Sequence, residues 1–203
     1  QKESVIDTFR QLSDRIGPNR VIWRYDPILF SQSMDVRYHL HGFEAIAKRL
    51  ASHTQTCVIS FVDLYQKTRR NLRATTAREP SADEITRLAS GMAAIASSYG
   101  IRIQSCAERI DLEPMGIRHG RCIDRMLIEE LLGGRLNVAR DRNQRPECGC
   151  VQSVDIGVYD TCSHGCLYCY ANTDTKTVCR NRVLHDPSSP LLIGRMEEGD
   201  VVK

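Results

Sequence analysis

The chain has 203 residues and a formal net charge of +3, and 41% of its residues are hydrophobic while 26% are charged. This balance is typical of a globular domain, and so small a net charge gives no argument for binding nucleic acid or a membrane surface. No apolar run approaches the roughly 20 residues that a helix needs to cross a bilayer, and the N-terminal segment lacks a signal-peptide pattern, so we expect a cytoplasmic protein without a membrane partner.

The first half of the chain alternates helix-like and strand-like apolar patterns. Helices are expected over residues 3–17, 38–53 and 81–100, and strands over 20–26, 56–63 and 101–108. Ser81 or Asp83 is expected to cap the third helix, and Gly100 to end it. Strands that alternate with helices predict a parallel sheet with right-handed crossovers. Because three such units are too few to close a barrel, we expect residues 1–108 to be the C-terminal half of a longer (β/α) barrel; an open sheet is the alternative.

From residue 109 the pattern becomes irregular. A short helix is expected over 123–132, ended by Gly133 and Gly134, and a polar loop follows it. Little regular structure is expected after Asn172, with residues 191–203 forming a short strand or a tail. The predicted organisation is therefore α/β: a partial (β/α) barrel with parallel strands over 1–108, followed by an irregular cysteine-rich segment and tail over 109–203.

Three acidic residues follow the predicted strands. Asp26, Asp63 and Glu108 stand at strand carboxyl ends, which form the active face of parallel α/β folds. They are candidate catalytic or substrate-binding residues. Ion pairs with arginines such as Arg24 are the alternative interpretation.

Nine cysteines in a chain without a secretory signal, and an odd number of them, favour metal ligation over disulfides. Cys162, Cys166 and Cys169 form a C-x-x-x-C-x-x-C motif. Three thiolates this close can hold three corners of a [4Fe-4S] cluster and leave the fourth iron open, and an open position is typical of a reactive metal. Two alternatives remain: three buried cysteines on one helix face, or a zinc site completed by His164 or by the pair Cys148 and Cys150.

This cysteine spacing is the one that radical S-adenosylmethionine (SAM) enzymes use. The segment CGCVQSVDIGVYDTCSHGCLYCYAN, preceded by DRNQRPE, resembles a bacterial family of uncharacterised proteins with radical-SAM-like cysteines at the C-terminus. RVIWRYDPIL, CVISFVDLYQKT and CAERIDLEPMGI extend the resemblance over most of residues 1–172. Two features depart from ordinary radical SAM enzymes: the motif follows the last strand rather than the first, and the glycine-rich and acidic SAM-binding motifs are not recognisable.

The resemblance implies a [4Fe-4S] cluster that binds SAM at its open iron, with Tyr168 near the adenine. It also implies radical chemistry on an unknown substrate and an electron donor such as flavodoxin or ferredoxin. The chain is therefore expected to be an enzyme. The alternatives are a non-catalytic zinc or structural iron–sulfur module and a nucleic-acid repair enzyme similar to spore photoproduct lyase.

The remaining cysteines allow a second site. Cys106, Cys122, Cys148 and Cys150 are candidate ligands of a closed second [4Fe-4S] cluster; the alternative is ordinary buried cysteines with a C-x-C pair that helps to bind zinc. Cys57 is expected in the core, and Cys179 has no assigned role.

Residues 66–78 form a basic segment. It carries Lys67, Arg69, Arg70, Arg73 and Arg78 and no acidic residue, which suits a phosphate or a nucleic-acid backbone. A solvated, partly helical loop is the alternative, because no aromatic residues are interleaved for base stacking.

Overall fold

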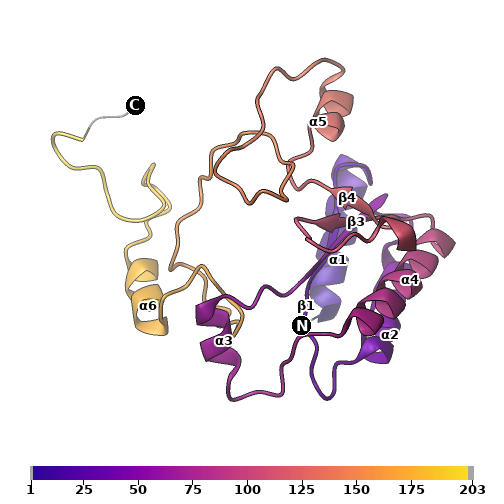
Figure 1. The fold of residues 1–203 in the computed structure, drawn as a ribbon. Helices are drawn as coiled ribbons and strands as arrows, with labels where there is room; N and C mark the ends of the chain where they lie inside the picture. Colours follow the sequence, from indigo (N-terminus) through magenta and orange to yellow (C-terminus); the bar gives the residue numbers. More distant parts are fainter. Residues whose placement is uncertain (1, 201–203) are drawn as a thin grey trace. The chain divides into compact units, whose positions relative to one another are not determined.

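The computed structural model describes residues 2–200, and they form two compact units. The first unit comprises the chain up to Val62 together with Thr76–Ser153, and the second comprises Asp63–Thr75 together with the chain from Val154 onward. Figure 1 follows the chain through both units by colour. Apart from residues 63–75, the units divide after Ser153, whereas the boundary expected from the sequence lies at residue 108, where the alternation of strands and helices ends.

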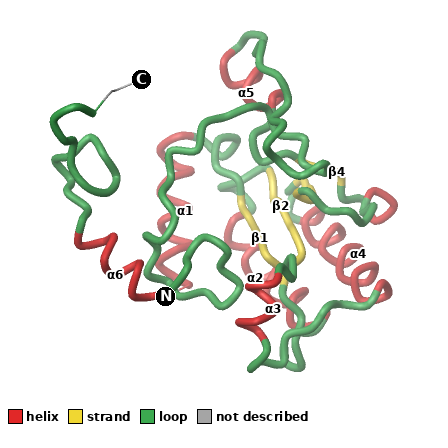
Figure 2. The backbone as a smooth tube through the Cα atoms, turned by 60° about the vertical axis from the view of Figure 1, so that its left-hand side comes forward, coloured by secondary structure: helices red, strands yellow, loops and turns green. Residues whose placement is uncertain are grey.

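A four-stranded parallel sheet forms the centre of the first unit. Its strands are β1 (Trp23–Ile28), β2 (Thr56–Phe61), β3 (Arg102–Cys106) and β4 (Arg118–Gly120), in the order β1-β2-β3-β4. Every neighbouring pair is parallel, and Figure 2 shows β1 and β2 running side by side. The α/β class and the parallel strands are thus confirmed. Within residues 2–200 the sheet is open and closes no barrel, and β4 is a strand that the sequence analysis did not predict.

Helices α1 (Lys2–Ile16), α2 (Val36–Leu50) and α4 (Ala82–Ser98) belong to the same unit. Phe43 of α2 and Met92 of α4 are fully buried in a core that they share with β1 to β3. The ring of Phe43 stacks on that of Trp23, with centroids 4.6 Å apart. The apolar periodicity that predicted these helices therefore marks the faces that they bury. The apolar face of α1 is only partly buried: Val5, one of its residues, is 67% exposed.

Local capping sets where α4 begins. The Ser81 hydroxyl accepts the Glu84 N–H at 3.2 Å, and the Glu84 carboxylate accepts the Ser81 N–H at 2.9 Å. This reciprocal pair is a capping box, so Ser81 rather than Asp83 is the cap. Arg78 adds an ion pair to Glu84, and the pKa of Glu84 falls to about 2, first through its bond to Arg78 and then through that to Ser81.

After β3 the first unit continues with short elements and long loops. The 3₁₀ helix η1 (Glu113–Met115) precedes β4, and α5 (Arg125–Leu132) follows it. Helix α5 ends, as expected, at Gly133, whose φ of 65° lies in the left-handed region that favours glycine. Residues 134–153 are irregular apart from a bridge between Arg140 and Val151.

The second unit contains helices α3 (Gln66–Leu72) and α6 (Thr175–Val183) and long loops. The expectation of little structure after Asn172 is wrong for α6, which begins where the Asp174 carboxylate accepts the Thr177 N–H at 2.9 Å. Residues 191–200 form turns and bends rather than a strand, and 201–203 lie outside the described residues. No helix among residues 2–200 is long and apolar enough to span a membrane.

Candidate functional site

Four thiols gather in the first unit, and we call them the four-thiol group: Cys106, Cys122, Cys148 and Cys150. Cys106 ends β3, and Cys122 follows β4 two residues after Gly120, which pairs with Cys106 in the sheet register. The Sγ atoms of Cys106 and Cys122 are 2.9 Å apart. The side chains of Cys148 and Cys150 are hydrogen-bonded to each other. Cys148 is close enough to Cys106 to raise the pKa of Cys106, and Cys122 is close enough to Cys148 to raise the pKa of Cys148.

Ionisation differs strongly within the group. The hydrogen bond from Cys122, followed by the contact with Arg24, lowers the pKa of Cys106 to about 6. The same hydrogen bond raises the pKa of Cys122, and burial raises it further. Burial also raises the pKa of Cys148. Thiolate character therefore concentrates on Cys106 rather than on Cys122.

Backbone and side-chain donors reach two of these sulfur atoms. Arg24 Nη1 donates to Cys122 Sγ at 3.1 Å, and the Ile123 N–H donates to Cys150 Sγ at 3.3 Å. Cys148 and Cys150 are almost fully buried, at 8% and 5% exposure. Cys148 and Cys150 therefore lie on the buried side of the group, and Cys122 lies on the side that faces solvent.

The loop that carries Cys148 and Cys150 is fixed through its own carbonyl groups. Arg140 donates to the Cys148 carbonyl from Nε at 3.0 Å and from Nη2 at 2.8 Å. The Asp141 N–H donates to the Cys150 carbonyl at 3.0 Å, and His119 Nε2 donates to the Glu147 carbonyl at 2.6 Å. These bonds hold Cys148 and Cys150 beside the end of the sheet. No sequence motif marks a side chain that binds a backbone carbonyl of another segment, so these roles of Arg140 and His119 could not be predicted.

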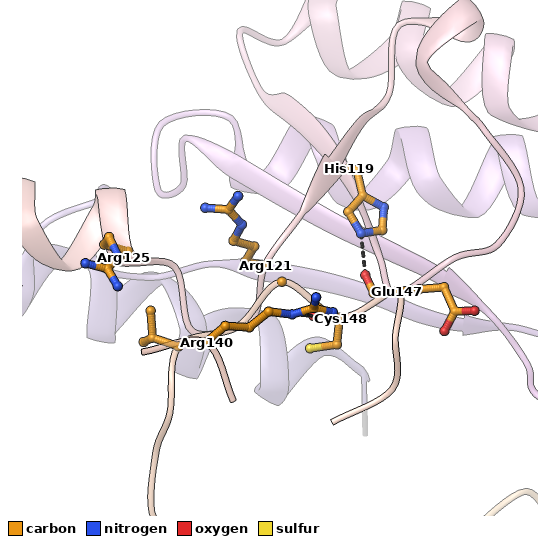
Figure 3. A pocket seen from close by; sticks show the side chains of 8 residues that line it. His119, Arg121, Arg125, Arg140, Glu147 and Cys148 are labelled. Atoms are coloured by element: carbon orange, nitrogen blue, oxygen red, sulfur yellow. Dashed lines mark hydrogen bonds between the residues drawn. The ribbon is translucent and has the colours of Figure 1, made fainter. Parts of the chain in front are cut away.

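A pocket of about 490 Å³ borders Cys148, and Figure 3 shows three arginines around it. Arg125 donates to the carbonyls of Leu136 and Val138, so its guanidinium is committed to the loop. Arg140 is likewise bonded to the Cys148 carbonyl, so two of these three arginines hold the loop. The residues that line the pocket are His119, Arg121, Arg125, Arg140, Glu147, Cys148, Gly149 and Val151.

The three predicted catalytic carboxylates, Asp26, Asp63 and Glu108, have protein partners. Asp26 Oδ2 accepts from Arg24 Nε at 3.1 Å and from the Ser60 hydroxyl at 3.4 Å. Glu108 Oε1 accepts the Phe61 N–H at 2.7 Å and lies on a second pocket of about 210 Å³. Asp63 belongs to the second unit, where it accepts from the Tyr65 hydroxyl at 3.3 Å. Asp26 thus forms the arginine pair that the sequence analysis considered, and the roles of all three in catalysis stay predictions.

In the second unit, Cys162, Cys166 and Cys169 lie on an irregular segment that we call the cysteine loop, residues 160–173. The segment is not helical, so the three thiols do not share a helix face. Cys162 and Cys166 are exposed and Cys169 is half-buried. A turn links the last two, with the Cys169 N–H donating to the Cys166 carbonyl at 3.0 Å. Gly165, with φ of 66°, allows the chain to reverse before Cys166.

Hydrogen bonds tie the two ends of the cysteine loop together. Asn172 Nδ2 donates to the Cys162 carbonyl at 2.6 Å, and the Asp160 N–H donates to the Ala171 carbonyl at 3.0 Å. Helix α3 contributes two further bonds: Asn71 Nδ2 donates to the Leu167 carbonyl at 3.1 Å, and Lys67 Nζ donates to the Asn172 carbonyl. The basic segment predicted to bind phosphate therefore uses Lys67 to hold the cysteine loop.

Among residues 2–200, no group of three or more histidine, cysteine, aspartate or glutamate side chains is already arranged to hold a metal ion. All nine cysteines are free thiols. Cys57 is fully buried in β2, where we expected a core residue, and Cys179 is exposed on α6. Tyr168 is 38% exposed.

Fold and thiols together define an α/β protein with an open parallel sheet and two separate groups of free cysteines. Residues 1–171 match the family described as a domain of unknown function, DUF1848. The chain belongs to this family, which confirms the resemblance to an uncharacterised family without assigning a reaction. Neither the curated proteins nor the solved structures contain a match to the chain.

Proposed function

We propose that the chain is an iron–sulfur enzyme of radical SAM type, in which Cys162, Cys166 and Cys169 hold a [4Fe-4S] cluster. The observation that carries the proposal is the placement of the C-x-x-x-C-x-x-C motif on an irregular, tied loop with two of its three thiols exposed. A cluster with one open iron needs this combination, because three sulfurs must bind it while a small molecule reaches the fourth position. The spacing resembles that of radical SAM enzymes, and family membership is compatible with it.

A second feature of the cysteine loop, an unpaired oxygen of Asn172, also supports a bound group beside the thiols. Asn172 Oδ1 is buried and has no hydrogen-bond partner in the described structure. Buried polar atoms are usually satisfied, and one that is not calls for an explanation such as an absent ligand or water. A bound group that donates a hydrogen bond would satisfy this oxygen beside the loop that carries the thiols.

Cys162, Cys166 and Cys169 would hold the cluster, which would supply reductive cleavage of SAM and removal of a hydrogen atom from a substrate. The chain's residues would prepare the site for this step. Lys67, Asn71 and Asn172 hold the loop in one conformation, and the half-exposed ring of Tyr168 would pack against the adenine. We further propose that flavodoxin or ferredoxin supplies the electron, and that the four strands are part of a larger (β/α) barrel.

The substrate is expected to contact the carboxylates of Asp26, Asp63 or Glu108. A non-catalytic metal–thiolate module is the competing function, and it predicts no turnover of SAM. A nucleic-acid repair enzyme is less favoured, because Lys67 of the basic segment is committed to the cysteine loop and Arg78 to Glu84.

The proposal is tested by measuring SAM cleavage. Full-length protein is purified without oxygen, reduced with dithionite and incubated with SAM, and 5′-deoxyadenosine is quantified by chromatography. Wild type and a Cys179→Ala control are expected to release it, because Cys179 lies on α6, outside the motif. Cys166→Ala is expected to release none above background. If wild type with a full complement of iron releases no 5′-deoxyadenosine, the enzyme proposal is wrong.

A further inference from the structure

The four-thiol group brings four potential metal ligands into contact within the first unit, and the proposed radical SAM site does not use it. Its members come from three stretches of chain: the end of β3, the segment after β4, and the loop around Gly149. Packing alone does not explain the convergence, because Cys122 is exposed and Cys106 is only partly buried. Four thiols brought together from distant segments are what a closed four-thiolate site requires.

The spacing of the sulfurs favours one metal ion over a cluster. With metal–sulfur bonds of about 2.3 Å, the sulfurs of a tetrahedral site are about 3.8 Å apart. Because the Sγ atoms of Cys106 and Cys122 lie 2.9 Å apart, coordination requires them to separate by only about 1 Å. A [4Fe-4S] cluster would hold its four cysteine sulfurs further apart, since the cluster itself lies between them. A single ion therefore requires a smaller displacement of Cys106 and Cys122 than the second [4Fe-4S] cluster would, and that cluster stays an untested prediction.

The surroundings suit bound thiolates. Outer partners that donate hydrogen bonds to ligand atoms orient the ligands and tune the metal. Here the Ile123 N–H and Arg24 already donate to Cys150 and Cys122. Four thiolates around a divalent ion carry a net charge of −2, and the Arg24 guanidinium offsets part of it at close range. The bonds from Arg140 and Asp141 to the carbonyls of Cys148 and Cys150 hold the C-x-C pair in place before any ion arrives.

We propose that Cys106, Cys122, Cys148 and Cys150 bind a single divalent ion, Zn²⁺ or Fe²⁺, in a closed tetrahedral site that joins the 134–153 loop to the carboxyl end of the sheet. Each thiol gives up its proton on coordination, and no oxidant or reductant is needed. The ion has no open position, so its role is to stabilise the loop and the cationic pocket beside Cys148. This site does not depend on the proposed function.

The test uses the full chain with Cys162, Cys166 and Cys169 all changed to alanine, which removes the proposed radical SAM site. Purified without oxygen, this variant is expected to keep about one zinc or iron per chain, as the four-thiolate stoichiometry requires, and no inorganic sulfide. Elemental analysis identifies the ion. Adding Cys148→Ser and Cys150→Ser is expected to lower the metal content at least roughly tenfold, because two of four ligands are lost. Adding Cys179→Ser instead is the matched control and should leave the metal content unchanged.

A second measurement covers the case in which the serine variants do not fold. The triple-alanine variant is alkylated with iodoacetamide before and after metal chelation, and the modified cysteines are mapped by mass spectrometry. Metal is expected to protect Cys106, Cys122, Cys148 and Cys150 together, and chelation to expose them together. A metal-free protein that takes up neither Zn²⁺ nor Fe²⁺, a disulfide between Cys106 and Cys122, or sulfide with several irons per chain would overturn the proposal. Each outcome is independent of whether wild type cleaves SAM.

Discussion

Single residues decide whether the cysteine loop is preorganised, and Asn172 is the clearest example. Its side chain binds the Cys162 carbonyl, and its own carbonyl accepts from Lys67. Its Oδ1 is buried without a partner, which costs about 1–3 kcal/mol. The residue therefore contributes one strong tie to the loop and keeps one acceptor available for a bound group.

Replacing Asn172 with alanine is expected to weaken iron binding by roughly 10–100-fold, because outer-shell residues that orient ligands contribute on this scale. Iron and sulfide are measured in anaerobic protein during titration with an iron chelator. The control is Asn137→Ala, since Asn137 is exposed in the first unit and far from the cysteine loop in sequence. Retention of iron equal to that of wild type would show that the tie to Cys162 does not matter for the cluster.

Secondary-structure elements bring Cys106 and Cys122 together, through the close pairing of β3 and β4. An added Cβ at Gly120 would lie 2.9 Å from the Ser105 carbonyl oxygen and 2.8 Å from Gln104 Cβ. The carbonyl is part of the sheet backbone and cannot move easily. Only glycine allows this approach, which places Cys122 next to the end of β3.

Gly120→Ala is therefore expected to force β4 away from β3 and to lower the free energy of unfolding by about 1–3 kcal/mol, the usual cost of overpacking. It should also lower the metal content of the four-thiol group. Chemical denaturation and elemental analysis measure the two effects. Gly134→Ala is the matched control, because a Cβ there meets nothing within 4 Å. Equal stability of the two variants would contradict the argument from close strand pairing.

The sequence predicts the helices and strands that have a clear apolar pattern, and it misses those that lack one. Helix α4 has an apolar face and a capping serine, and both could be recognised before the structure was known. Helix α6 has neither a broad apolar face nor an acidic first turn, and Val178 is its buried residue. Its start depends on the Asp174 cap alone, which is too weak a signal in a polar segment. Strand β4 has three residues, too few for an alternating pattern.

The whole molecule consists of two units, each with its own set of thiols. Cys162, Cys166 and Cys169 of the second unit are close in sequence, so their motif could be recognised directly. The four-thiol group depends on tertiary structure: the sequence named its members but could not show that Cys106 and Cys122 are in contact. The bond from Arg24 to Cys122 joins residues 98 positions apart and has no sequence signal. The bond from the Phe61 N–H to Glu108 was hidden for the same reason, whereas the pair of Asp26 with Arg24, two residues away, could be considered from the sequence.

The central claim is that three thiols hold a cluster whose fourth iron remains open to SAM. The most direct measurement is electron paramagnetic resonance of the reduced, anaerobically purified full chain, recorded with and without SAM. Wild type is expected to give a [4Fe-4S] signal that changes when SAM is added, and Cys166→Ala is expected to lack it. A cluster signal that SAM leaves unaltered, or protein that binds zinc but no iron at these cysteines, would contradict the claim.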